Sequence, residues 1–181
     1  MIINTTPIEG VAVIDLELKS DDRGFFARAF DREAFVEAGL NPACEQCNVS
    51  FNHTAGTLRG MHYQLDWAPE TKLVRCTRGA IVDIIVDMRP DSPTYLQHVE
   101  VELTADNRRA LYVPAMFAHG YQTLVDATEV TYQVSGVYTP AAERGRRYDD
   151  PALGLDWPLP VSTISAKDAA WPLLEAEGAS A

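Results

Sequence analysis

The chain has 181 residues, of which 46% are hydrophobic and 23% are charged, and its formal net charge at pH 7 is −11. This length and balance predict one folded domain with a sizeable core, extending over residues 1–181. The negative charge excludes general nucleic-acid binding, which needs a basic face, whereas an anionic small molecule remains compatible with a locally basic pocket. The basic residues that such a pocket could use are Arg23, Arg59, Lys72 and Arg75.

No apolar run in the sequence is long enough to span a bilayer, so we expect no membrane partner. The first residues lack the basic region and apolar core of a signal peptide, and we expect a cytoplasmic location. Cys44 and Cys47 have the spacing of a redox or zinc half-site, but no second pair of metal ligands is visible. We interpret them as plain structural or surface thiols of a reducing compartment.

The predicted elements begin with two strands and a short helix. Segments 11–18 and 25–30 have strand patterns, with a turn at 21–24 between them. A helix is predicted over 31–38, because Asp31 is suited to cap its N-terminus and Gly39 to end it.

From Cys47 onward the pattern is that of strands, separated by turn signals such as Arg78 and Gly79. Many short strands at regular spacing predict a sandwich or a barrel. The region after Pro140 is richer in proline, glycine and charge, with a helical turn or two expected over 166–174. The further strands are predicted over 48–51, 56–64, 72–77, 80–87, 98–103, 110–113, 120–124 and 129–134.

The segment 56–64 contains an arginine and a histidine bounded by glycines. Arg59 and His62 are three residues apart, so on a regular strand they would face opposite sides. A bend at Gly60 could bring them to one site, as an anion clamp beside a base. A histidine has an unperturbed pKa of about 6.5 and can accept a proton near neutral pH. The competing interpretation, a hydrogen-bonded core histidine, stays open.

Four later residues extend this set of candidates. Lys72 begins a predicted strand, and His119 lies in 114–120, which we predict to be a turn between strands. Tyr132 shares a strand face with two valines, which is more typical of a core residue, although a tyrosine in a polar pocket can donate a proton. Asp168 alone would be a surface charge.

A metal site is a further alternative, because double-stranded jelly rolls often hold a metal. The usual ligands are two histidines separated by one residue, then a carboxylate and a later histidine. Here Gly60 and Gln64 stand two positions before and after His62, and only the later histidine, His119, is present. We therefore expect no metal.

Taken in order, these residues resemble the dTDP-4-dehydrorhamnose 3,5-epimerase family, whose members are cupin-like jelly rolls without a metal. The resemblance implies an all-β, cupin-like double-stranded β-helix (jelly roll) with a few short helices, a nucleotide-sugar substrate and no cofactor. It also implies a homodimer in which N-terminal strands join the partner's sheet. The matching segments cover nearly the whole chain: 22–26, 57–64, 72–75, 78–83, 87–89, 92–94, 117–120, 149–151, 156–158 and 165–168, with Pro114, Tyr132 and Tyr138.

The resemblance also implies a role for each candidate. His62 would be the general base, paired with Asp168, and Tyr132 the general acid on the opposite face of the sugar. Lys72 would stabilise negative charge on the C4 oxygen of a 4-keto-6-deoxy sugar. The implied substrate-binding residues are Arg23, Phe26, Arg28, Gln46, Asn48, Arg59, His119, Tyr138 and Lys167.

The implied function is a cofactor-independent epimerase that inverts C3, C5 or both by proton abstraction next to the C4 ketone. The alternatives are a mono-epimerase, a metal-dependent cupin oxygenase and a non-catalytic sugar-nucleotide-binding module. Three positions differ from the residue that is frequent in the family and bear on nucleotide recognition. Arg28 stands in place of a glutamate, Cys47 in place of an aspartate and Tyr148 in place of a tryptophan.

Overall fold

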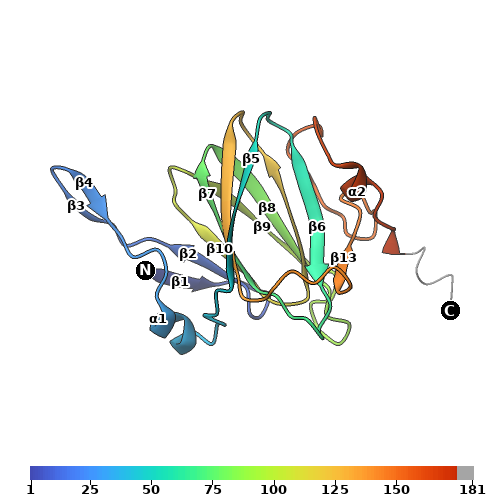
Figure 1. The fold of residues 1–181 in the computed structure, drawn as a ribbon, viewed down its shortest axis with the longest axis horizontal. Helices are drawn as coiled ribbons and strands as arrows, with labels where there is room; N and C mark the ends of the chain where they lie inside the picture. Colours follow the sequence, from blue (N-terminus) through green and yellow to red (C-terminus); the bar gives the residue numbers. More distant parts are fainter. Residues whose placement is uncertain (175–181) are drawn as a thin grey trace.

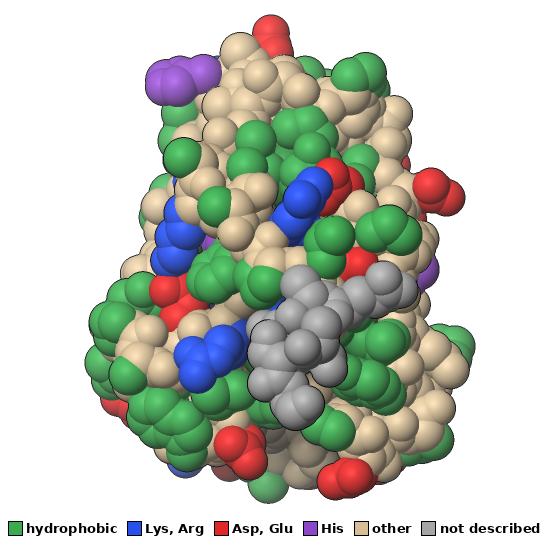
Figure 2. Space-filling view, turned by 90° about the vertical axis from the view of Figure 1, so that its right-hand side faces the viewer, with side chains coloured by type: hydrophobic (Ala, Val, Ile, Leu, Met, Phe, Trp, Pro, Cys, Tyr) green, Lys and Arg blue, Asp and Glu red, His purple; other side chains and the backbone are tan. Residues whose placement is uncertain are grey.

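The computed structural model describes residues 1–174, and two antiparallel β-sheets that face each other make up most of it (Figure 1). Among these residues, no helix is both long and apolar enough to cross a membrane. On the face that Figure 2 shows, acidic and basic side chains of the described residues are interspersed.

The first sheet has six strands, namely β1 (Ile2–Thr5), β2 (Ala12–Asp15), β5 (Gln46–Asn52), β7 (Lys72–Arg78), β10 (Ala110–Val113) and β12 (Thr128–Val134). Their order across the sheet is β1-β2-β10-β7-β12-β5, and each neighbouring pair is antiparallel.

The second sheet has five strands, namely β6 (Leu58–Gln64), β8 (Ala80–Asp87), β9 (His98–Thr104), β11 (Phe117–Thr123) and β13 (Glu143–Gly145). Their order is β13-β6-β11-β8-β9. Sequence neighbours are thus distributed over both sheets, as in a jelly roll. The remaining elements are the hairpin β3 (Lys19–Asp21) and β4 (Gly24–Phe26), and the helices α1 (Arg32–Glu37) and α2 (Ala166–Ala169).

The main core lies between the sheets, because strand residues alternate between the two faces. Val74, Leu111 and Val130 of the first sheet pack with Ile81 and Phe117 of the second. Each such side chain stabilises the fold by roughly 1.5–3 kcal/mol when fully buried. The predicted all-β fold with short helices is confirmed.

Local signals account for the elements that the sequence predicts well. The carboxylate of Asp31 accepts hydrogen bonds from the backbone N–H groups of Glu33 (3.1 Å) and Ala34 (3.2 Å), which caps α1 as expected. Gly39, with φ +73°, follows the helix end. The predicted strand over 25–30 is wrong beyond Phe26, and the helical turn expected over 166–174 ends as α2 at Ala169.

The prediction that 114–120 forms a turn is wrong beyond Met116. The turn ends at Met116, whose φ is +62°, and β11 begins at Phe117. Phe117 and Ala118 pair with the end of β8, which extends the β11–β8 ladder to Phe117, and both side chains are buried. His119 therefore lies inside a central strand, only 9% exposed.

Candidate active site

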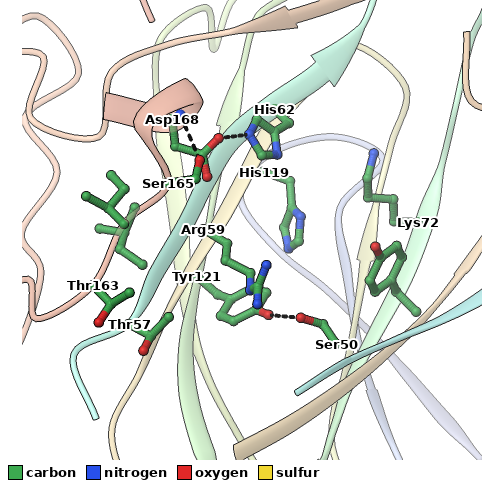
Figure 3. Close-up of a pocket in the computed structure, with 13 residues that line it drawn as sticks. Ser50, Thr57, Arg59, His62, Lys72, His119, Tyr121, Thr163, Ser165 and Asp168 are labelled. Atoms are coloured by element: carbon green, nitrogen blue, oxygen red, sulfur yellow. Dashed lines mark hydrogen bonds and ion pairs between the residues drawn. The ribbon is translucent and has the colours of Figure 1, made fainter. Parts of the chain in front are cut away.

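A cavity of about 490 Å³ lies between the two sheets, and both of them line it (Figure 3). The lining residues of the second sheet are Leu58, Arg59 and His62 on β6, with His119 and Tyr121 on β11. Those of the first sheet are Ser50 on β5, Lys72 on β7 and Tyr132 on β12, and the wall is completed by Thr57, Thr163, Ile164, Ser165 and Asp168.

An irregularity in β6 turns Arg59 and His62 to the same side. His62 pairs with His119, and Arg59 pairs with Tyr121, so three residue steps on β6 match two on β11. This is the pattern of a β-bulge, in which one strand carries an extra residue. The bulge includes Gly60, whose φ is +130°, and the predicted bend there is confirmed.

Two glycines allow β6 and β11 to approach closely at this bulge. A Cβ atom on Gly60 would lie 2.4 Å from the Cα of Gly120, and one on Gly120 would lie 2.5 Å from the sulfur of Met61. No side chain fits in that space, and only glycine adopts the φ of Gly60 without strain. Gly60 and Gly120 thus shape this part of the cavity wall.

His62 and Asp168 form a hydrogen-bonded pair. His62 Nε2 lies 2.6 Å from Asp168 Oδ1, and the other carboxylate oxygen accepts the N–H of Gly60 at 3.3 Å. The hydroxyl of Ser165 caps α2 by accepting a hydrogen bond from the backbone N–H of Asp168 at 3.0 Å, which fixes the backbone of Asp168.

Burial alone would raise the pKa of Asp168, but the hydrogen bond and charge of His62, with the Gly60 and Ser165 contacts, lower it below its ordinary value. An ionised Asp168 makes Nε2 the donor and leaves the lone pair on Nδ1 of a neutral imidazole. His62 is therefore set up to accept a proton.

Tyr132 comes from the sheet opposite His62. Its ring packs against the main core while it also lines the cavity, so the core interpretation and the polar one both describe it. Burial raises the pKa of Tyr132 and the charge of Glu70 adds to this, while Arg59 acts in the opposite direction. The hydroxyl is protonated at neutral pH and available to donate.

The ammonium group of Lys72 interacts with two acidic residues, Glu70 and Asp83. Its Nζ forms an ion pair with Glu70, and both side chains are largely buried. On the neighbouring part of the cavity, His119 Nε2 lies 2.7 Å from Asp83 Oδ1. Burial raises the pKa of Asp83, whereas His119 and Lys72 lower it. The cavity thus holds two histidines that each lie beside a carboxylate, of which only the His62–Asp168 contact has hydrogen-bond geometry.

Arg59 is oriented by β5. Its Nε donates to Asn52 Oδ1 at 2.8 Å, and one terminal nitrogen lies 3.4 Å from the carbonyl of Phe51. Beside it, Ser50 Oγ and the hydroxyl of Tyr121 share a hydrogen bond of 2.9 Å (Figure 3). These groups give the cavity a polar corner suited to an anionic ligand.

The remaining predicted substrate-binding residues lie outside this cavity. Arg23, at the β3–β4 turn, has a side chain that is 90% exposed and paired with Asp21, and Phe26 is 66% exposed. Arg28 pairs with Asp31 at 2.7 Å. The structure of one chain does not bring these three to His62.

Gln46 and Asn48 belong to β5, and Asn48 lines a smaller cavity of about 200 Å³ that also touches Tyr132. Tyr138 and Lys167 meet at a shared acceptor, since both donate to Glu143, at 2.8 Å and 2.7 Å respectively. Cys44 and Cys47 are exposed, with sulfur atoms 3.5 Å apart, and lie away from the larger cavity.

Sequence reasoning missed several residues of the site. Asp83 carried a usable signal, because it is a lone carboxylate in the apolar run 80–86, and a buried charge needs a partner. Ser50, Tyr121 and Glu70 carried none, since polar residues at those spacings are common on surface strands. Among residues 1–174, no group of three or more His, Cys, Asp or Glu side chains is placed to hold a metal ion.

The fold and this site define a cupin-like jelly roll whose cavity is equipped for proton transfer. The model of the dTDP-4-dehydrorhamnose 3,5-epimerase family matches residues 5–176, and the chain belongs to this family. A dTDP-4-dehydrorhamnose 3,5-epimerase of Sinorhizobium fredii is 39% identical over 96% of this chain and 90% of its own length. The family resemblance predicted from the sequence is therefore confirmed.

Solved structures show the same likeness. The dTDP-4-dehydrorhamnose 3,5-epimerase of Bacillus anthracis with TDP and PPi bound has a TM-score of 0.91 and 39% identity, covering 95% of this chain and 98% of that one. ChmJ, a 3'-monoepimerase from Streptomyces bikiniensis in complex with dTDP-quinovose, has a TM-score of 0.87 and 32% identity, covering 97% and 89%. Relatives thus include double epimerases and a mono-epimerase.

Proposed function

We propose that this chain epimerises a nucleotide-diphosphate 4-keto-6-deoxy sugar, with dTDP as the nucleotide, at C3, at C5 or at both. One observation carries the proposal: the hydrogen-bonded His62 and Asp168 face Lys72 and Tyr132 across a single cavity. The nucleotide follows from the TDP and dTDP-sugar ligands of the relatives.

In this proposal, His62 removes the proton next to the C4 ketone through Nδ1. Asp168 holds the other nitrogen and stabilises the imidazolium that forms. The electron pair of the broken C–H bond delocalises onto the C4 oxygen, where the ammonium of Lys72 stabilises the negative charge. The substrate's own ketone is the electron sink, so no cofactor takes part.

Inversion requires that the proton returns to the other face of the sugar. His62 and Tyr132 belong to different sheets, and the cavity separates them. Tyr132 donates its hydroxyl proton to the carbanion carbon on the face opposite His62. Solvent then reprotonates the phenolate and takes the proton from the imidazolium of His62, which restores both groups. C3 and C5 both flank C4, so one charge-stabilising lysine serves either centre.

The diphosphate is bound by Arg59 and His119, which lie on the cavity wall. We place Arg23 and Phe26 in the same site through a homodimer, because the β3–β4 hairpin extends away from the sheets of its own chain (Figure 1). Phe25 and Phe26 are 46% and 66% exposed on it, which is unfavourable unless another surface covers them. A hairpin reaching the partner subunit's cavity would complete the substrate site.

Product analysis tests the proposed function. The purified protein is incubated with dTDP-4-keto-6-deoxyglucose, and the sugar configuration is determined by NMR. Inversion at C3, C5 or both supports the epimerase and identifies its type. An unchanged sugar with a folded protein contradicts the function, and binding without conversion would instead indicate the non-catalytic module.

A further inference from the structure

The position beside His62 on β13 has no side chain of its own. Residues directly opposite each other in an antiparallel ladder place their side chains about 5 Å apart. His62 is paired with His119 on β11 and with Gly145 on β13. Because Gly145 lacks a Cβ atom, the space next to the imidazole on that side is open to a group from elsewhere.

Trp171 fills this space. A Cβ atom on Gly145 would lie 2.1 Å from Cε2 and 2.2 Å from Cδ2 of the indole, so the ring lies where a side chain at position 145 would be. The ring centroids of Trp171 and His62 are 6.2 Å apart with an interplanar angle of 66°, which is an edge contact. The indole thus lies against the side of the imidazole.

The same short segment carries Asp168. Asp168 binds His62 Nε2, and Trp171 follows three residues later, just after α2 ends. Lys167 adds a further contact, with its ammonium nitrogen 5.6 Å from the centre of the indole ring. Residues 165–171 therefore touch the imidazole at one nitrogen and at one edge.

The indole occupies this space at an energetic cost. Trp171 Nε1 is buried and has no hydrogen-bond partner among the residues that the structure describes. A buried N–H without a partner is unfavourable and uncommon in folded proteins. Trp171 is not one of the residues that line the cavity, whereas His62 is.

We propose that Trp171 is a positioning residue that holds the imidazole of His62 in the orientation needed for proton abstraction. A hydrogen bond at Nε2 fixes one point of the ring but lets the ring tilt about that point. Contact along the edge removes this freedom, and small errors in the placement of a reacting group slow catalysis strongly. The inference rests on the proposed function, in which His62 is the base.

Steady-state kinetics of Trp171→Ala and Trp171→Phe test this role. For Trp171→Ala we expect kcat to fall on the order of 10- to 100-fold, with KM changed less than about 2-fold. Trp171→Phe keeps an aromatic edge and omits the unpaired N–H, so its kcat should stay within about 3-fold of the wild type. Equal losses of kcat in both variants, or none in Trp171→Ala, would overturn the proposal.

The nitrogen NMR signals of the His62 ring give a readout that needs no substrate. We expect the Nε2-protonated form in all three proteins, because Asp168 is present in each, with ring signals that are shifted or broadened only in Trp171→Ala. Unaltered signals in a folded Trp171→Ala protein would contradict positioning. If the wild-type protein does not convert the sugar, the proposed function fails, whereas these spectra still decide whether Trp171 holds the ring.

Gly145→Ala supplies a matched test of the shared space. Its methyl group would displace the indole, so it should reproduce the loss of kcat seen in Trp171→Ala although Trp171 is present. In the Trp171→Ala background the methyl has room, and Gly145→Ala should add less than about 2-fold. Losses that instead multiply would show that the two positions act independently, which would overturn the proposal.

Discussion

Tyr132 shows how one side chain can serve both the core and the site. Part of its ring packs against the core while its hydroxyl end belongs to the cavity wall. Its pKa is raised mainly by burial, which keeps the hydroxyl protonated well above neutral pH. A phenylalanine would keep the packing of the ring and lose only the hydroxyl group that donates the proton.

Tyr132→Phe should therefore separate the two halves of the reaction. We expect turnover to fall about 10²-fold or more, while exchange of the substrate proton with solvent falls less than about 10-fold. Both rates can be followed on one sample, by NMR for the product and by mass for the exchange. If exchange is lost as completely as turnover, Tyr132 is not the acid.

At the scale of elements, the β6 bulge is the feature on which the cavity depends. Gly60→Ala would combine a strained backbone with a Cβ atom 2.4 Å from Gly120. Gly24 offers a matched control, because its φ of +129° is nearly that of Gly60 and nothing lies within 4 Å of its Cβ position.

We expect Gly24→Ala to lower the free energy of unfolding by about 1–2 kcal/mol through backbone strain, because no atom of its own chain lies near the added Cβ. Gly60→Ala should cost at least about 2 kcal/mol more, because the neighbouring strand must also move. Denaturant unfolding measures both. Equal losses would mean that the strands are not closely packed at the bulge.

The loop after β8 is held by a single carboxylate. Asp87 accepts hydrogen bonds from Arg89 Nη2 (2.7 Å), Ser92 Oγ (2.6 Å) and Thr94 Oγ1 (2.7 Å). Burial alone would raise the pKa of Asp87, but these hydrogen bonds outweigh it and hold the pKa well below its ordinary value. The ionised form is therefore favoured in the folded state.

Because the folded-state pKa of Asp87 is the lower one, its contribution is present above the unfolded pKa of about 3.9 and is lost as pH falls below it. Asp87→Asn should lower the free energy of unfolding by about 1–3 kcal/mol at pH 7. The difference from the wild type should shrink as pH is lowered from about 4. Unfolding curves that stay equally far apart at all pH values would contradict this.

At the scale of the molecule, the fold was more predictable than the site. The pattern predicts the strand over 80–87 with its correct bounds, because six of its eight residues are apolar and turn signals flank the run on both sides. The pattern misplaces His119, because Pro114 and Gly120 are typical turn residues. Gly120 instead serves close packing against Gly60, which depends on a strand distant in sequence.

The site could be predicted only through its family. Nothing local to Asp168 indicates that it meets His62, because 105 residues lie between them and the contact depends on how the C-terminal segment crosses β6. For Arg23 the family resemblance implies substrate binding, but within one chain Arg23 lies outside the cavity.

Subunit mixing tests whether the hairpin serves the partner. His62→Ala and Arg23→Ala should each be inactive or nearly so as homodimers. In a mixed dimer, one cavity would combine an intact His62 with the partner's intact Arg23. We expect re-associated mixtures to recover up to about a quarter of wild-type activity, from one cavity in half of the dimers. No recovery in verified mixed dimers would show that the hairpin does not complete the partner's cavity.

The proposed mechanism requires that His62 removes a carbon-bound proton next to the C4 ketone. Incubation with dTDP-4-keto-6-deoxyglucose in heavy water, followed by mass and NMR analysis, tests it directly. The wild type should introduce deuterium at C3, C5 or both, and His62→Asn should lower the rate of incorporation by about 10²–10⁴-fold. Incorporation at the wild-type rate by a folded His62→Asn protein would contradict the claim.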